Sequence, residues 1–204
     1  MLIGNPLIIN CPNCNKAYTQ TNLTSGNTFG GVFWSDGSFF APMLPELPVF
    51  TRCTACETIF NIQSAPNREA DQWQEAEKLP NTELLEENDL VYALENKIYI
   101  NKDEEIYLRK KLWWKLNHHP WKQEKPESIE SSLYKHNNEA LIALLDTSDD
   151  DQLLMQAELH RNLGNFDTCL NLISQLTDSR DETRVTLLKK ACKKKIRGTF
   201  QIEY

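Results

Sequence analysis

Two short stretches, Cys11-Pro12-Asn13-Cys14 and Cys53-Thr54-Ala55-Cys56, decide the fold of the first third of this 204-residue chain. In each stretch two residues separate the cysteines, so a tight turn brings both sulfurs to the same side of the loop. Two such loops that face each other supply four thiolates, the ligand set that Zn²⁺ takes in structural sites. We therefore predict a structural Zn²⁺ site formed by Cys11, Cys14, Cys53 and Cys56. Four thiolates fill a tetrahedral coordination sphere, so this metal would stabilise the fold and perform no chemistry.

Iron and disulfides are the alternatives for these cysteines. Rubredoxin-type iron also accepts four cysteines, but its loops usually place glycine after each second cysteine, where this chain has Asn15 and Glu57. The chain's six cysteines could instead form three disulfides. In a reducing compartment, however, paired C-x-x-C motifs are more often metal ligands. Cys169 and Cys192 stand apart in helical patterns, where we expect buried apolar residues rather than reactive or ligating thiols.

The segments that flank both cysteine pairs have the composition of short strands. Strands are expected at residues 7–9, 16–19, 49–52 and 57–62, which makes residues 1–66 a zinc-ribbon domain. The two pairs are further apart than the common spacing of about 15 to 20 residues, so a segment is inserted between them. Ser35-Asp36-Gly37 lies there between aromatic, β-prone runs and predicts an inserted β-hairpin. The aromatic residues are expected in the core, with an exposed patch for a partner as the alternative.

Residues 67–204 have helical patterns, with helices expected at 69–78, 82–94, 103–115, 126–146, 149–163, 166–176 and 180–196. Short links between helices favour packed helical hairpins. The predicted fold class is therefore α+β, a small antiparallel zinc-ribbon domain followed by an all-α domain. His118 and His119 precede Pro120 at the end of one helix, where a capping role is expected rather than a metal or catalytic role.

Residues 153–176 resemble one tetratricopeptide repeat, near 150–180 in the predicted helical domain. Gly164 permits a close turn, and Leu153, Ala157, Cys169, Ile173 and Leu176 have the spacing of that motif's interhelical contacts. The match is partial because His160 replaces the usual aromatic residue and Asp181 the closing proline. No second copy follows at an offset of 34 residues. A single repeat cannot bury its own faces, so it must pack on neighbouring helices.

Most of the chain resembles an uncharacterised group of bacterial proteins that combine a cysteine-rich ribbon with a tetratricopeptide-like helical tail. The resemblance rests on residues 25–29, 34–37 and 41–45, on the second C-x-x-C, and on Ala-Glu-Leu-x-Arg-x-x-Gly-x-Phe at 157–166. It implies this architecture and a bacterial source. It implies no activity.

The last helix concentrates positive charge in a chain whose net charge is −7. Between residues 184 and 197 there are seven basic side chains and no acid. A docked helix with solvated lysines is one account; a polyanion-binding surface is the other. The candidate polyanion-binding residues are Lys189, Lys190, Lys193, Lys194 and Arg197. Residues 199–204 alternate in polarity and could add a strand to an open sheet edge, that of the ribbon for example.

Composition and apolar runs point to a cytoplasmic protein. No apolar run approaches the roughly 18 residues of a membrane helix, and the first residues lack the pattern of a secretory signal. We expect a noncatalytic zinc-binding scaffold or adaptor that binds a protein or peptide partner through its helical domain. The alternative is a nucleic-acid-associated factor that uses the basic last helix, which the net charge disfavours. An enzyme is the third hypothesis, and no motif in the sequence predicts one.

Overall fold

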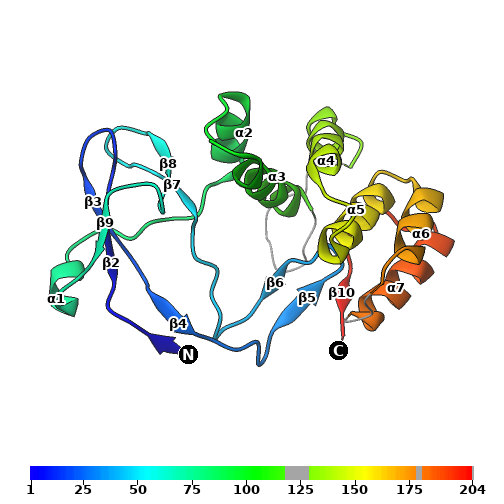
Figure 1. The fold of residues 1–204 in the computed structure, drawn as a ribbon, viewed down its shortest axis with the longest axis horizontal. Coiled ribbons are helices and arrows are strands. Elements are labelled where there is room, and N and C mark those ends of the chain that lie inside the picture. Colours follow the sequence, from blue (N-terminus) through cyan, green and yellow to red (C-terminus); the bar gives the residue numbers. More distant parts are fainter. Residues whose placement is uncertain (118–128, 178–180, 204) are drawn as a thin grey trace. The chain divides into compact units, whose positions relative to one another are not determined.

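The computed structural model describes residues 1–117, 129–177 and 181–203, and their contacts divide the chain into two compact units. Unit 1 comprises Met1–Gly31 and Phe40–Ile100, and unit 2 comprises Val32–Phe39 and Asn101–Tyr204. Small antiparallel sheets and helices make the fold α+β (Figure 1). His118, His119 and the predicted helix start at Pro126 lie outside the described residues.

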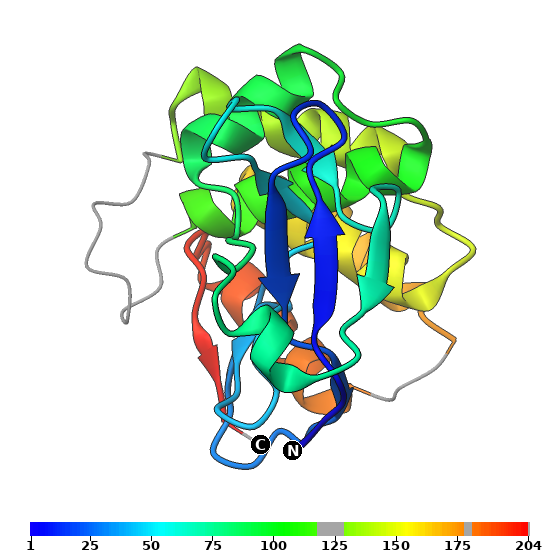
Figure 2. The same cartoon turned by 90° about the vertical axis from the view of Figure 1, so that its left-hand side faces the viewer.

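Unit 1 is built from short antiparallel strands. Its three-stranded sheet has the order β3-β2-β9, with β2 in the centre (Figure 2). Two further pairs, β7 with β8 and β1 with β4, complete the strands of this unit. The bounds are β1 (Leu2–Ile3), β2 (Leu7–Asn10), β3 (Ala17–Gln20), β4 (Leu23–Ser25), β7 (Phe50–Arg52), β8 (Ile59–Asn61) and β9 (Asn67–Glu69). The four strands predicted around the cysteine pairs are thus present as β2, β3, β7 and β8.

The core of unit 1 lies between the two cysteine-tipped hairpins. Ile9 of β2 lies opposite Tyr18 of β3, and both side chains are buried. Phe60 of β8 packs in the same cluster. Two of the cysteines, Cys11 and Cys53, belong to this cluster as well, so the apolar core and the cysteine site form together.

The helices predicted at 69–78 and 82–94 are much shorter in the structure, as α1 (Trp73–Ala76) and α2 (Glu87–Glu95). The flanking residues instead form backbone hydrogen bonds at the two edges of the three-stranded sheet. Strand β9 pairs with β2, and the N–H of Ala70 donates to the carbonyl of Pro6 at 2.8 Å. On the other edge, Thr82 donates to the carbonyl of Thr19 at 2.9 Å. Open edges need backbone partners, and that need outweighed the local helical pattern.

Five helices form most of the described part of unit 2: α3 (Lys102–Leu116), α4 (Ser132–Leu144), α5 (Asp150–Asn162), α6 (Phe166–Ser174) and α7 (Glu182–Lys193). Four of them begin at a polar N-cap whose side chain accepts a backbone hydrogen bond three residues later: Asn101, Ser131, Asp149 and Asp181. These caps fix the starts of α3, α5 and α7 close to the predicted positions, whereas α4 begins at Ser132, later than the predicted start at Pro126. Within the described ranges, no helix combines the length and apolarity of a membrane span.

The inserted hairpin is present as β5 (Val32–Trp34) and β6 (Phe39–Phe40), with Gly37 at φ +79° in its turn. The predicted C-terminal strand also forms, as β10 (Gln201–Ile202), but it pairs with β5 rather than with a ribbon strand. The hairpin from Val32 to Phe39 therefore belongs to the helical unit, and residues up to Ile100 belong to the ribbon unit. The compact units are distributed differently along the chain from the domains predicted at 1–66 and 67–204.

The aromatic residues of the insertion divide between core and surface. Trp34 is buried at 3% exposure, as expected. Phe29, Phe39 and Phe40 are exposed at 82%, 44% and 54%, so the expectation that they form core is wrong. The ring of Phe39 stacks on that of Phe33, with centroids 5.9 Å apart, so Phe39 is partly covered.

Helices α5 and α6 form a packed pair at the predicted position of the tetratricopeptide-like repeat. Gly164 ends α5 at φ +88°, and the N–H of Asn165 donates to the carbonyl of His160. Ala157, Cys169 and Ile173 share one core cluster with residues of α7. Leu176 packs against the same cluster, whereas Leu153 is buried but is not part of it. Membership of the tetratricopeptide family stays a prediction.

Candidate metal centre

The four cysteines of the two C-x-x-C pairs lie together in unit 1. All four sulfurs are within 4.8 Å of one another, with Cys11 and Cys56 at 3.6 Å and Cys14 and Cys53 at 3.5 Å. Each short distance joins one cysteine from each pair. A tetrahedral site with metal–sulfur bonds of about 2.3 Å has sulfurs about 3.8 Å apart. The four sulfurs are therefore close enough to hold one metal ion.

Both cysteine loops have the same backbone hydrogen bonds. The N–H of Asn15 donates to the carbonyl of Cys11 at 2.9 Å, and the N–H of Glu57 donates to the carbonyl of Cys53 at 2.8 Å. One residue further on, Lys16 and Thr58 each accept the N–H of the first cysteine at 2.9 Å. The two halves are local repeats of one turn, and each presents its two sulfurs in the same way.

The residue after each second cysteine adopts a left-handed conformation. Asn15 has φ 60° and Glu57 has φ 62°. These are the positions that glycine usually occupies in rubredoxin-type loops, and the backbone here takes the conformation that glycine favours. The missing glycines therefore leave the loop geometry unchanged and do not distinguish zinc from iron.

Side chains around the sulfurs were not identified from the sequence. The hydroxyl of Tyr18 donates to the sulfur of Cys53 at 3.2 Å and accepts the N–H of Thr54 at 2.8 Å. The sulfur of Cys56 lies 3.3 Å from the hydroxyl oxygen of Thr58, to which Asn13 donates from the opposite loop. Such partners orient metal ligands and tune their charge. Tyr18 is the largest of them, and it is 1% exposed.

Hydrogen bonds make the four thiols unequal as acids. The side chain and backbone N–H of Thr58 lower the pKa of Cys56 to about 5. Burial opposes ionisation of Cys53, but hydrogen bonds from Tyr18 and from the backbone lower its pKa. The N–H of Lys16 acts to lower the pKa of Cys14, yet the neighbouring sulfurs and burial raise it to about 12. Four thiolates this close repel one another, so full ionisation requires a cation among them.

The donor set is complete within the protein. In the part of the chain that the structure describes, no histidine, aspartate or glutamate joins the cysteine cluster. Cys11 and Cys53 are buried, while Cys14 is exposed and Cys56 half-buried. Four sulfur donors would leave no position for water or substrate, the arrangement of a structural metal site.

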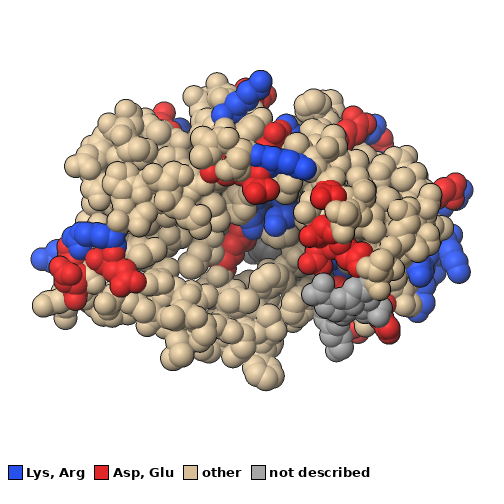
Figure 3. Space-filling view, in the orientation of Figure 1, with Lys and Arg blue, Asp and Glu red and all other residues tan. Residues whose placement is uncertain are grey.

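The predicted polyanion-binding residues lie at the C-terminal end of α7. Lys189, Lys190, Lys193 and Lys194 are all exposed, and basic side chains gather at this edge of unit 2 in Figure 3. Arg197 differs from these lysines. Its Nε donates to the carbonyl of Asn162 at 2.9 Å, and its guanidinium forms an ion pair with Glu130. Its charge is engaged within the fold of unit 2.

A buried polar cluster in unit 2 was not predicted from the sequence. Ser35, from the turn of the inserted hairpin, donates to Glu158 of α5 at 2.7 Å. The Nε of Arg161 donates to the same carboxylate at 2.7 Å, and its Nη1 donates to the carbonyl of Gly198 at 3.0 Å. Ser35, Glu158 and Arg161 are each 0% exposed. The sequence signal was present in the Glu158-x-x-Arg161 spacing, which places both side chains on one helix face.

This cluster joins segments that are distant in sequence. The neighbouring Asp36 accepts a hydrogen bond from the side-chain amide of Asn117 at 2.7 Å, and Trp114 donates to its backbone carbonyl at 3.1 Å. Arg184 of α7 donates to the carbonyl of Ser35 at 2.9 Å. The charged groups satisfy one another inside unit 2, so they hold the hairpin among the helices.

No protein-family model, no curated protein and no solved structure matches the chain.

Proposed function

We propose that the chain is a cytoplasmic, noncatalytic zinc-binding scaffold or adaptor that binds a protein or peptide partner through its helical unit. The observation that carries this proposal is the set of four mutually close sulfurs in unit 1. Because the protein supplies all four donors, the ion holds two β-hairpins together and has no free position for chemistry. The ribbon is then a stable module attached to a helical binding unit.

Zinc is the proposed metal because closed four-cysteine sites at C-x-x-C spacing are typical of structural zinc. Iron would fit the same sulfurs, and the loop backbone does not separate the two metals. Purified protein should contain close to one zinc per chain by elemental analysis and should be colourless. A red protein with one iron per chain would refute the zinc assignment and leave the four-sulfur site intact.

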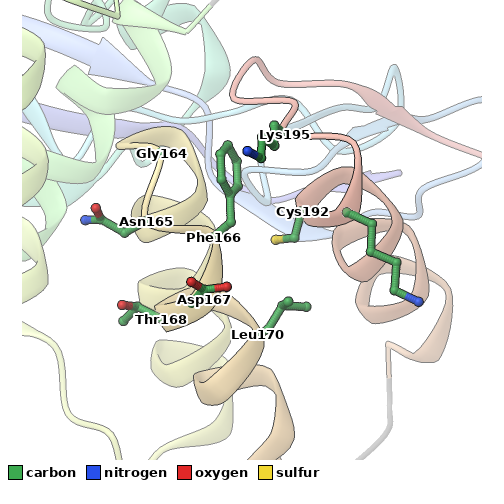
Figure 4. Close-up of a pocket in the computed structure, with 9 residues that line it drawn as sticks. Gly164, Asn165, Phe166, Asp167, Thr168, Leu170, Cys192 and Lys195 are labelled. Atoms are coloured by element: carbon green, nitrogen blue, oxygen red, sulfur yellow. The ribbon is translucent and has the colours of Figure 1, made fainter.

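The proposed partner site is the open pocket of unit 2 where α6 begins beside the end of α7. The pocket has a volume of about 510 Å³, and Phe166, Leu170 and Thr168 lie along it (Figure 4). Apolar side chains next to exposed polar ones suit a short peptide segment, because the apolar part contributes binding free energy and the polar part orientation.

Affinity purification from the native cell tests partner binding. Thr168 is exposed and belongs to the pocket lining, so Thr168→Arg adds a long charged side chain at the pocket with little effect on the fold. Asn171→Arg is the matched control, because Asn171 is exposed on the same helix but is not part of the lining. A partner should co-purify with the wild type and with Asn171→Arg and should be lost with Thr168→Arg. Equal recovery with all three proteins would place the partner elsewhere.

A nucleic-acid-associated factor remains the second candidate, favoured by the exposure of Lys189, Lys190, Lys193 and Lys194 on α7. Phosphate contacts release counterions, so binding of a random-sequence RNA or DNA probe should weaken steeply as salt rises. Replacing these four lysines by glutamate should abolish that binding. Absence of any binding by the wild type at low salt would remove this candidate.

A further inference from the structure

Cys169 of α6 and Cys192 of α7 form a second pair of neighbouring thiols. Their sulfurs are 3.3 Å apart, and the residues are 0% and 3% exposed. The pair lies in unit 2, in the core cluster that also contains Ala157 and Leu188, whereas the four metal-site cysteines lie in unit 1. The sequence predicted both residues as buried, and they are; their contact was not predicted.

A disulfide between these cysteines requires little movement. Bonded sulfurs are about 2.05 Å apart, so the two helices or side chains need to close the gap by only about 1.3 Å. Both thiols already face each other across the contact between α6 and α7. The bond would connect two helices that are otherwise held together by apolar packing in this cluster.

One of the two cysteines can be reached from solvent. Cys192 lines the open pocket beside α6, and in Figure 4 its sulfur points from α7 toward α6, between Phe166 and Leu170. Cys169 is not among the lining residues, and its sulfur contacts that of Cys192. A small oxidant that enters the pocket therefore meets the sulfur of Cys192 first.

We propose that Cys169 and Cys192 are a site of reversible oxidation, where hydrogen peroxide or a small organic peroxide converts the thiol pair to a disulfide between α6 and α7. The thiolate of Cys192 attacks one peroxide oxygen; the S–O bond forms, the O–O bond breaks, and the leaving oxygen takes up the thiol's proton as water or an alcohol. The sulfur of Cys169 then attacks the sulfenic sulfur of Cys192. An S–S bond forms, the S–O bond breaks, and the proton of Cys169 leaves with the hydroxide as water. Two electrons pass from the sulfurs to the peroxide.

The surroundings set the conditions under which this site reacts. Burial raises the pKa of both thiols, so the reactive thiolate is scarce and oxidation is slow. The site therefore responds to sustained peroxide rather than to a brief pulse. Thiol reductants of the cytosol would reverse the bond, as they do for other redox-sensing disulfides.

Thiol mapping of the zinc-loaded full chain tests the proposal. The protein is incubated with hydrogen peroxide, denatured in N-ethylmaleimide, digested and analysed by mass spectrometry. We expect a cross-linked peptide containing Cys169 and Cys192, its loss on treatment with dithiothreitol, and unchanged zinc content. The thermal midpoint of the oxidised protein should be several degrees higher than that of the reduced protein, because the bond restricts the unfolded chain.

Two variants test the order of attack, and alanine is used because both sites are buried and apolar. In Cys169→Ala, the sulfenic acid of Cys192 should persist and be trapped by dimedone. In Cys192→Ala, Cys169 should stay reduced under the same conditions. The wild-type map remains decisive if either variant fails to fold. The proposal is overturned if Cys169 and Cys192 are both fully alkylated at a peroxide dose that has already released the zinc. It is also overturned if they are cross-linked to the metal-site cysteines instead of to each other.

Discussion

At the two cysteine loops the backbone adopts a conformation that costs free energy for residues other than glycine. Asn15 tolerates the left-handed region because its short polar side chain can bond locally, whereas Glu57 at φ 62° has no such advantage. The ion pair of Glu57 with Arg52 is exposed on both sides and contributes little. Glu57 therefore stores backbone strain next to Cys56, a proposed metal ligand.

Glu57→Gly should relieve this strain. We expect the free energy of unfolding of the zinc-bound protein to rise by about 0.5 to 1 kcal/mol. This is the usual cost of a non-glycine residue in the left-handed region, reduced by the greater conformational freedom of glycine in the unfolded chain. Guanidinium-induced unfolding, followed by a fluorescence signal from unit 1, measures this free energy. Glu57→Ala is the control, because alanine also loses the ion pair but keeps the strain. An equal gain for both variants would contradict the explanation.

Tyr18 is a buried residue outside the four cysteines whose hydroxyl contacts one of the sulfurs. Tyr18→Phe removes the hydroxyl that contacts the sulfur of Cys53 and accepts the N–H of Thr54. Loss of such a partner lowers metal affinity by roughly 10- to 100-fold. Competition with a chromophoric chelator gives the affinity. Tyr92→Phe, on an exposed tyrosine of α2, should have no effect, and comparable losses for both would argue against a specific role of Tyr18.

Residue types at fixed spacing carried the prediction of the metal site. The four cysteines could be assigned from sequence because two C-x-x-C turns restrict where their sulfurs can lie. Tyr18 and Thr58 could not, because a tyrosine or a threonine has many structural uses and only the folded hairpins bring these hydroxyls to the sulfurs. The contact between Cys169 and Cys192 was missed for the same reason.

Among the elements, most helices of unit 2 were predictable, whereas strand β9 was not. Local signals such as the caps at Asn101 and Asp149 determine where a helix begins. Strand β9 instead exists because β2 has a free edge, a property of the assembled sheet that the sequence of Asn67–Glu69 does not display. The tertiary context, rather than the local sequence pattern, determines the conformation of these residues.

Glu158 and Arg161 form a fully buried ion pair on one face of α5, where Ser35 of the inserted hairpin donates to Glu158. Glu158→Gln leaves the buried guanidinium without its counter-ion, which costs about 3 to 5 kcal/mol of stability. The loss of stability should appear as a lower midpoint of thermal unfolding, followed by circular dichroism at 222 nm. Glu139→Gln, at an exposed position of α4, should change stability by less than about 0.5 kcal/mol. A similar small effect at Glu158 would show that the pair is not important for packing.

In the whole molecule, the chain passes from unit 1 to unit 2 and back before it enters the long helical segment. The insertion between the cysteine pairs supplies β5, and the C-terminal residues supply β10 beside it. The sequence predicted the hairpin and the final strand but could not predict their pairing, because contacts between residues about 170 apart leave no periodic pattern. The α+β class was predictable, since it depends on composition and periodicity alone.

Loss of a metal ligand should affect the two units differently. Cys11→Ser should remove the zinc and unfold unit 1, since the ion contributes folding free energy to the two hairpins. Helices α3 to α7 lie in unit 2, so most of the helical circular dichroism should remain. Cys192→Ala is the control with one fewer buried thiol and an intact metal site. Retention of both zinc and ribbon stability in Cys11→Ser would show that Cys11 is not a ligand.

X-ray absorption at the zinc edge of the purified full chain tests the metal site most directly. The account predicts one zinc per chain with a first shell of four sulfurs at about 2.3 Å and no nitrogen or oxygen ligand. A first shell containing nitrogen or oxygen, or a protein without metal whose four cysteines are joined as disulfides, would contradict it.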